Sequence, residues 1–207
     1  MQAQTVGAWL EALASDAAAP GGGAAAAMQV AVGAALIEMV CSLTIGKPAY
    51  AEHEPTMRTA RTEASALRDQ ALRLAGQDAQ AFAAVAAAYR LAKDTDQERR
   101  ARTERIQAAL AGAADVPLRT AATAAAVVDL AGRILDGANR NVLSDVAVAA
   151  AAARAGLEAA TVNVEVNLVA LADPARRGDL AARLAPYGKA VDEAHAIVQA
   201  VRARIAG

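Results

Sequence analysis

A single lysine is the first residue whose type and position could do chemistry. Lys47 is the first basic residue of the chain, and it ends a long apolar stretch in the sequence TIGKPAY. Gly46 and Pro48 flank it and fix the direction in which the chain leaves the preceding helix. A lysine at a helix exit is either a solvated charge favoured by the helix dipole or a proton donor that faces a pocket.

Three consecutive glycines form a second candidate site in the sequence PGGGAAAA. Gly21, Gly22 and Gly23 precede a predicted helix, so they leave backbone N–H groups uncovered at the positive end of its dipole. An anion or a flat ring could approach such a turn closely, but a tight turn between packed helices needs glycine equally. The turn is not a P-loop, because the Gly-Lys-Ser/Thr ending is absent.

Acidic and amide side chains supply the remaining candidates. Asp78 falls on the apolar seam of a predicted helix, where a carboxylate is costly unless it is paired or lines a wet cavity. Asn141, Ser144 and Asp145 crowd a predicted helix start in the sequence GANRNVLSDV. Residues of these types serve there either as helix caps or as parts of a site.

Two further asparagines follow along the helix that begins near Asp145. Asn163 and Asn167 are spaced four residues apart, so they lie on one helix face. They lie roughly 27 Å along the helix axis from Asp145. The two asparagines therefore cannot share a pocket with Asp145 inside one chain, whereas in a symmetric dimer they could.

The composition predicts that helices position these residues. The chain is 56% hydrophobic but only 2% aromatic, because its apolar residues are mostly Ala, Val and Leu, and alanine is the best helix former. Apolar spacing, prolines and caps predict the following helices: 5–14, 23–43, 55–91, 95–114, Pro117 to the sequence DGAN, Asn141 or Ser144 to Leu171, and 174–205. Two long heptad seams, within 57–88 and 180–205, predict an all-α, multi-helix up-and-down bundle. We expect one domain over 1–207, and a dimer that covers the remaining apolar faces.

Charge and cysteine content argue against several classes of protein. The net charge is −1 and no basic cluster adjoins aromatic residues, which argues against nucleic acid as a partner. Cys41 is the one cysteine, so there is no internal disulfide and no cysteine metal site. The apolar run 24–46 is long enough to span a membrane, but it contains Glu38 and much alanine. We therefore expect a buried helix in a soluble, cytoplasmic protein, since the N-terminus also lacks the basic region of a signal peptide.

Four ordered stretches resemble one known family. They are APGGGAAAA, LTIGKPAY, DAQAFAAV with KDTDQE and ADVPL, and NRNVLSDVAVAAAAARAGLEAATVNVEVNL. Together they are similar to the formiminotetrahydrofolate cyclodeaminase and methenyltetrahydrofolate cyclohydrolase family. The resemblance implies an all-helical homodimer that acts on one-carbon units carried by tetrahydrofolate, with no metal and no cofactor beyond the folate substrate.

The resemblance also implies site residues. The implied catalytic residues are Lys47, Asp145 and Asp78, and the implied substrate-binding residues are Gly21, Gly22, Gly23, Tyr50, Phe82, Asn141 and Ser144. We assign Asp145, with Asp78 as the alternative, as the carboxylate that steadies a methenyl cation and takes a proton from water. Lys47 is assigned as the donor to the oxygen or to the departing nitrogen.

Three functions remain open from the sequence. The first is a methenyltetrahydrofolate cyclohydrolase, which the absence of a formiminotransferase segment in these 207 residues favours. The second is a formiminotetrahydrofolate cyclodeaminase, which would release ammonia and give the same methenyl cation. The third is a non-catalytic helical scaffold, since Ala24, Pro48 and Ala49 stand where the family often has serine or lysine.

Overall fold

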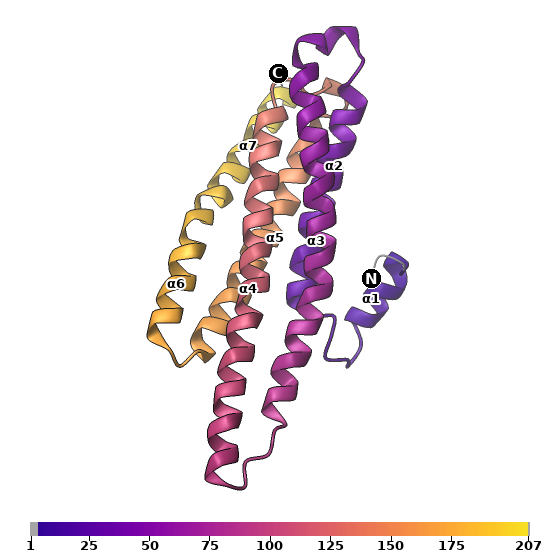
Figure 1. Ribbon diagram of the computed structural model, residues 1–207. Helices are drawn as coiled ribbons and strands as arrows, with labels where there is room; N and C mark the ends of the chain where they lie inside the picture. The colour runs from indigo at the N-terminus through magenta and orange to yellow at the C-terminus, as the bar shows by residue number, and fades with distance from the viewer. Residues whose placement is uncertain (1–3, 207) are drawn as a thin grey trace.

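The computed structural model describes residues 4–206, and the secondary structure of this part of the chain is entirely helical (Figure 1). The α-helices are α1 (Val6–Leu13), α2 (Gly22–Thr44), α3 (Glu54–Tyr89), α4 (Asp96–Ile134), α5 (Leu143–Ala170), α6 (Pro174–Leu184) and α7 (Lys189–Ala206). Short 3-10 turns lie between them at η1 (Pro48–His53), η2 (Arg140–Val142) and η3 (Ala185–Tyr187). The predicted all-α class is therefore confirmed.

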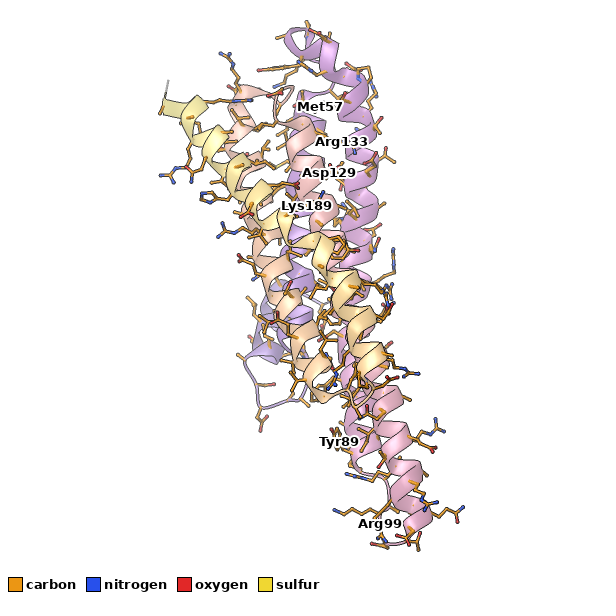
Figure 2. All side chains as sticks on the ribbon, turned by 90° about the vertical axis from the view of Figure 1, so that its left-hand side faces the viewer. Met57, Tyr89, Arg99, Asp129, Arg133 and Lys189 are labelled. Carbon is orange, nitrogen blue, oxygen red and sulfur yellow. The ribbon has the colours of Figure 1, made fainter. Side chains whose placement is uncertain are left out.

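Four long helices form the body of the molecule. Helices α2, α3, α4 and α5 lie side by side along one axis, with α7 and α6 against α4 and α5 and the short α1 beside the start of α2 (Figure 1). The α3–α4 hairpin extends beyond the other helices, and Figure 2 shows Tyr89 and Arg99 near its far end. Thr95 and Glu98 form the predicted capping box at the start of α4, where each side chain accepts a backbone N–H of the other residue.

The apolar seam of α3 faces the core as its spacing predicts. Met57, Ala60, Ala64, Ala71 and Leu74 are fully buried. Small residues at most of these positions allow α3 to approach α2 and α4 closely. The regular spacing therefore fixes which face of α3 is buried, and with it the direction in which Asp78 points.

Two predicted helix boundaries are wrong. We expected a helix to end near Ala114 and another to begin at Pro117, but α4 continues through Pro117 without a break. A proline inside a helix costs about 3 kcal/mol. Pro117 is buried, and the flanking part of α4 packs on α3 and α5, which offsets this cost.

The last predicted helix is divided in the structure. A single helix was expected over 174–205, but α6 ends at Leu184 and α7 begins at Lys189. Pro186 and Gly188 lie in the intervening turn, and both residue types favour a break. The apolar seam continues across the turn because Leu184, Tyr187 and Val191 still pack against the core.

Helices α2 and α5 are in very close contact. A Cβ at Gly33 would lie 2.9 Å from the carbonyl oxygen of Ala149, and one at Gly156 would lie 2.9 Å from that of Ala26. The early part of α2 thus meets the later part of α5, and the later part of α2 meets the early part of α5. The two helices therefore run antiparallel, with their backbones nearly touching.

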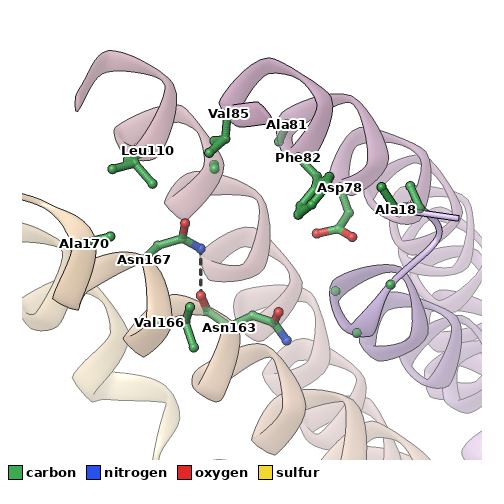
Figure 3. A pocket seen from close by; sticks show the side chains of 15 residues that line it. Ala18, Asp78, Ala81, Phe82, Val85, Leu110, Asn163, Val166, Asn167 and Ala170 are labelled. Carbon is green, nitrogen blue, oxygen red and sulfur yellow. Dashed lines mark hydrogen bonds between the residues drawn. The ribbon is translucent and has the colours of Figure 1, made fainter. Parts of the chain in front are cut away.

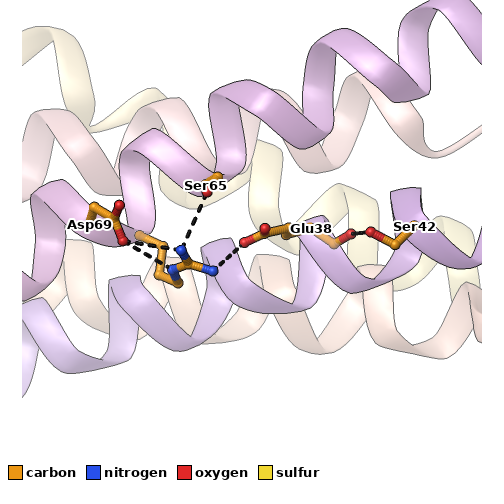
Figure 4. A network of polar contacts seen from close by, with 5 residues as sticks. Glu38, Ser42, Ser65 and Asp69 are labelled. Atoms are coloured by element: carbon orange, nitrogen blue, oxygen red, sulfur yellow. Dashed lines mark hydrogen bonds and ion pairs between the residues drawn. The ribbon is translucent and has the colours of Figure 1, made fainter. Parts of the chain in front are cut away.

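Helix α2 is the most apolar element of the bundle. It is long and apolar enough to cross a membrane, but 56% of its most apolar window is buried inside the protein, as in the core helix of a bundle. Cys41 is fully buried on it, and this burial raises the pKa of the thiol to about 11. Glu38, which could have paired with Lys47, instead pairs with Arg68 of α3, and Arg68 also binds Asp69 and Ser65 (Figure 4).

Candidate functional site

A cavity of about 380 Å³ opens between the start of α2, the later part of α3, the middle of α4 and the C-terminal part of α5. Its lining includes seven of the residues singled out from the sequence, namely Gly21, Gly22, Gly23, Asp78, Phe82, Asn163 and Asn167. Figure 3 shows Asp78 and Phe82 on one side of the cavity and Asn163 and Asn167 on the other. Asp78 is the one titratable side chain in the lining that the structure describes.

Asp78 holds the N-terminus of α2 from a neighbouring helix. Gly21 at the N-cap position has no side chain to accept a hydrogen bond, and Asp78 Oδ2 accepts one from the backbone N–H of Ala24 at 3.0 Å instead. Burial raises the pKa of Asp78 above its ordinary value, and the hydrogen bond from Ala24 opposes this shift. The start of α2 is thus already occupied by a carboxylate, which makes it a poor site for an anion.

Gly23 is required by this contact. A Cβ at Gly23 would lie 2.1 Å from Asp78 Oδ1, and atoms that are not bonded cannot approach so closely. Gly23 is also buried. The third glycine of the turn therefore makes room for the carboxylate, whereas Gly21 leaves open space where a Cβ would be.

Asn163 and Asn167 present oxygen atoms to the opposite wall. The side-chain amide of Asn163 donates to the carbonyl of Ala159 at 2.8 Å, and that of Asn167 donates to the carbonyl of Asn163 at 2.8 Å. Each amide group is thereby anchored to its own helix, and neither Oδ1 atom accepts a hydrogen bond from the residues that the structure describes. The sequence showed that the two side chains share a face, but not that this face meets Asp78.

The other predicted site residues lie together at the far end of α2. Lys47 follows the end of α2 and is exposed, and Tyr50 lies in η1, where its hydroxyl accepts the backbone N–H of Arg140 at 3.0 Å. Asn139 links the two segments, because its side chain donates to the carbonyl of Leu43 at 3.0 Å. Asn141 precedes α5, and Ser144 and Asp145 belong to its first turn.

Within one chain, the predicted site residues therefore lie in two separate groups. The group at the glycine turn comprises Gly21, Gly22, Gly23, Asp78 and Phe82, and the group at the opposite end comprises Lys47, Tyr50, Asn141, Ser144 and Asp145. The 23 residues of α2 separate the two groups by about 35 Å. Asp78 consequently cannot act beside Lys47 of its own chain.

The two groups also differ in their surroundings. The group at the glycine turn lines the cavity described above. In the opposite group, Lys47 and Ser144 are exposed, Asp145 is partly buried, and Tyr50 lines a second cavity. Over residues 4–206, no group of three or more His, Cys, Asp or Glu side chains lies close enough together to bind a metal ion.

A family model described as formiminotransferase-cyclodeaminase matches residues 5–186. The chain belongs to the formiminotransferase-cyclodeaminase family. The resemblance stated from the four sequence stretches is thus confirmed. Both groups of predicted residues fall inside the matched part of the chain, and α7 lies beyond it.

Two curated members of the formiminotransferase-cyclodeaminase family differ in how much of their length this chain spans. A methenyltetrahydrofolate cyclohydrolase from Methylorubrum extorquens is 45% identical over 172 residues, which cover 83% of each chain. The formimidoyltransferase-cyclodeaminase of Rattus norvegicus is 38% identical over 156 residues, which are 75% of this chain but 29% of that protein.

A solved structure of the same family has the same fold. The crystal structure of a formiminotetrahydrofolate cyclodeaminase from Thermotoga maritima superposes with a TM-score of 0.88 at 26% identity. The superposition covers 100% of this chain and 99% of that one. The helical arrangement described above is therefore that of a known family member.

Proposed function

We propose that the protein is a methenyltetrahydrofolate cyclohydrolase, which hydrolyses 5,10-methenyltetrahydrofolate to 10-formyltetrahydrofolate. The observation that carries this proposal is the 45% sequence identity between this chain and the Methylorubrum extorquens cyclohydrolase, which extends over most of both chains. We further propose that it works in the cytoplasm as a soluble protein and uses no metal and no cofactor beyond the folate substrate.

Asp145 and Lys47 are proposed to carry the chemistry. Water adds to the methenyl carbon between N5 and N10 while Asp145 takes a proton from the water. The carbon–N5 bond of the adduct then breaks, Lys47 donates a proton to N5, and the remaining hydroxyl proton leaves as the formyl group forms on N10. One water is consumed and one proton is released in total, and a carboxylate beside the cation stabilises both flanking transition states.

The proposed active site needs two copies of the chain. Asp78 and Lys47 lie about 35 Å apart along α2, so one chain cannot bring both to a single folate. A two-fold axis perpendicular to α2 reverses the direction of that helix, so it would bring the Lys47 end of one copy over the cavity of the other. Each dimer would then contain two equivalent sites.

An exposed apolar face supports this dimer. Val148, Val162 and Val169 lie on one face of α5 at successive spacings of fourteen and seven residues, and they are 52%, 57% and 84% exposed. Val32 and Met39 are further exposed apolar side chains on α2, the helix that packs against α5. Val166, which is 66% exposed, also lines the cavity, so the proposed dimer surface borders the proposed site. Contiguous apolar surfaces of this kind mark protein–protein contacts.

The activity is tested directly with methenyltetrahydrofolate. We expect the purified protein to accelerate the loss of its near-ultraviolet absorbance far beyond the buffer rate. Lys47→Ala and Asp145→Asn should each slow turnover by about 100-fold or more while the melting temperature stays unchanged. Near-normal rates in both variants would contradict the assigned roles, and no hydrolysis by the unmodified protein would contradict the function.

A second candidate function is formiminotetrahydrofolate cyclodeaminase. It is favoured by the fold shared with the Thermotoga maritima protein of that name. In this reaction N10 attacks the formimino carbon and ammonia leaves, so the same acid and base could serve. Ammonia released from 5-formiminotetrahydrofolate, at a rate exceeding hydrolysis of the methenyl compound, would favour this function over the first.

A further inference from the structure

The cavity beside the glycine turn offers hydrogen-bond acceptors and no positive charge. Its described lining contains the carboxylate of Asp78 and the side-chain oxygens of Asn163 and Asn167, but no lysine, arginine or histidine. Pro117 adds to this character, because it has no N–H to donate to the carbonyl of Ala113, another lining residue. Such a cavity suits a ligand with several N–H donors and repels carboxylates.

The two ends of a folate differ in their hydrogen-bond donors and in their charge. The pterin ring is flat and carries N–H groups on one edge, namely the 2-amino group, N3–H and, in the reduced ring, N8–H. The other end is a glutamate with two carboxylates. Only the pterin end matches the acceptors of the cavity, and the volume of about 380 Å³ is near the lower limit for small-molecule pockets, as expected if it takes one end of the ligand.

We propose that this cavity binds the pterin ring of the folate, with Asp78 accepting hydrogen bonds from the 2-amino–N3 edge and Asn163 and Asn167 accepting from the second hydrogen of the 2-amino group and from N8–H. This inference rests on the proposed function, since it assumes a folate substrate. Asp78 Oδ2 is held by the N–H of Ala24, which fixes the carboxylate plane. Oδ1 accepts no hydrogen bond from the described part of the protein, so it is free to bind the ring.

Phe82 supplies the stacking surface. It lies four residues after Asp78 on α3, so the two side chains emerge from the same helix face, and Figure 3 shows them on the same wall. Phe82 is 49% exposed, which is unusual for a large apolar side chain inside a cavity. A bound ring would cover this exposed surface and gain an aromatic contact.

The direction of the ligand follows from the position of the ring. N5 and N10 lie between the pterin and the glutamate, so a pterin in the cavity places the reactive carbon at its mouth. The glutamate then extends away from Asp78. The mouth borders the apolar face on which a second copy is proposed to lie, and Lys47 and Asp145 of that copy would approach the carbon from there.

The experiment uses two half-ligands with the full-length protein. Binding of 6-hydroxymethyl-7,8-dihydropterin, whose reduced ring carries N8–H, and of p-aminobenzoylglutamate is measured by calorimetry for the unmodified protein and for the variants Asp78→Asn, Asn163→Leu and Asn167→Leu. We expect each variant to weaken pterin binding by roughly tenfold or more and to leave p-aminobenzoylglutamate binding unchanged. Gln80→Ala on α3 and Glu165→Gln on α5, both exposed and outside the cavity lining, are the matched controls and should change neither.

The outcomes separate this inference from the proposed function. Asp78 also holds the start of α2, so melting curves accompany each variant, and the two asparagine variants test the inference if Asp78→Asn fails to fold. Hydrolysis of methenyltetrahydrofolate without detectable pterin binding, or variants that weaken only p-aminobenzoylglutamate, would overturn the inference and leave the function standing. Pterin binding that the variants weaken, without any hydrolysis, would support the inference and contradict the function.

Discussion

Asp78 of α3 has two roles. Its carboxylate caps the N-terminus of α2 by accepting the backbone N–H of Ala24, and it also lines the cavity. Its pKa is raised by burial, and the hydrogen bond from Ala24 only partly offsets this shift. Only the ionised form accepts two hydrogen bonds from the pterin edge without a competing proton. We therefore expect pterin affinity to be constant at neutral pH and to fall as the pH drops through the raised pKa of Asp78.

This pH dependence can be measured by titrating 6-hydroxymethyl-7,8-dihydropterin at a series of pH values. The decline should begin at a higher pH than the ordinary aspartate value of 3.8, because burial favours the protonated form. Asp78→Asn should bind weakly with no such decline. A variant that keeps the full pH dependence would show that another group is responsible.

Gly23 gives a prediction about stability at the same place. Gly23→Ala would put a methyl group 2.1 Å from Asp78 Oδ1, so the carboxylate must move and its bond to Ala24 is lost. We expect a loss of about 1–3 kcal/mol in the free energy of unfolding. The matched control is Gly76→Ala in α3, where nothing lies within 4 Å of the new Cβ, and where we expect a gain of about 0.5–1 kcal/mol. Urea unfolding of the two variants checks both signs, and equal effects would contradict the close contact.

At the scale of the helices, the contact between α2 and α5 positions both groups of site residues. Gly156→Ala would place a Cβ 2.6 Å from a methyl group of Val30 and 2.9 Å from the carbonyl oxygen of Ala26. The helices would have to separate, and we expect a loss of about 1–3 kcal/mol of stability. Gly112→Ala in α4, with nothing within 4 Å, is the control and should be neutral or stabilising. Thermal melts of both variants measure the difference, and a stable Gly156→Ala variant would contradict it.

Some features of the helices could be predicted from the sequence, and others could not. The seam of α3 and the capping box of α4 follow from local spacing, and the structure confirms both. Pro117 misled the prediction because its cost is local, whereas the packing that offsets it comes from α3 and α5. The sequence does predict that Asn163 and Asp145 lie at different ends of the bundle, because both are on one helix and their separation along it follows from their residue numbers. The sequence does not predict which end Asp78 joins, because its hydrogen-bond partner Ala24 belongs to another helix.

At the scale of the whole molecule, the apolar face of α2 and α5 should hold two copies together. We expect the unmodified protein to sediment as a dimer, and Val162→Glu to sediment as a monomer with little activity, because a charge would be buried in the contact. Val6→Glu, at a 68% exposed position on α1, is the control and should remain dimeric. Sedimentation velocity distinguishes these states, and a fully active monomer would contradict a site that two copies share.

A shared site makes a sharper prediction when two impaired variants are mixed, each lacking one of the two side chains. In a chain with Lys47→Ala the cavity is intact, and in a chain with Asp78→Asn the lysine is intact, so a mixed dimer contains one site with both residues and one site with neither. Because random mixing gives about half mixed dimers, each with one working site, we expect about a quarter of the unmodified activity per chain. The variants should be unfolded and refolded together so that subunits exchange, and each alone serves as the control. Activity that does not rise on mixing would mean that Lys47 and Asp78 do not serve one folate across two chains.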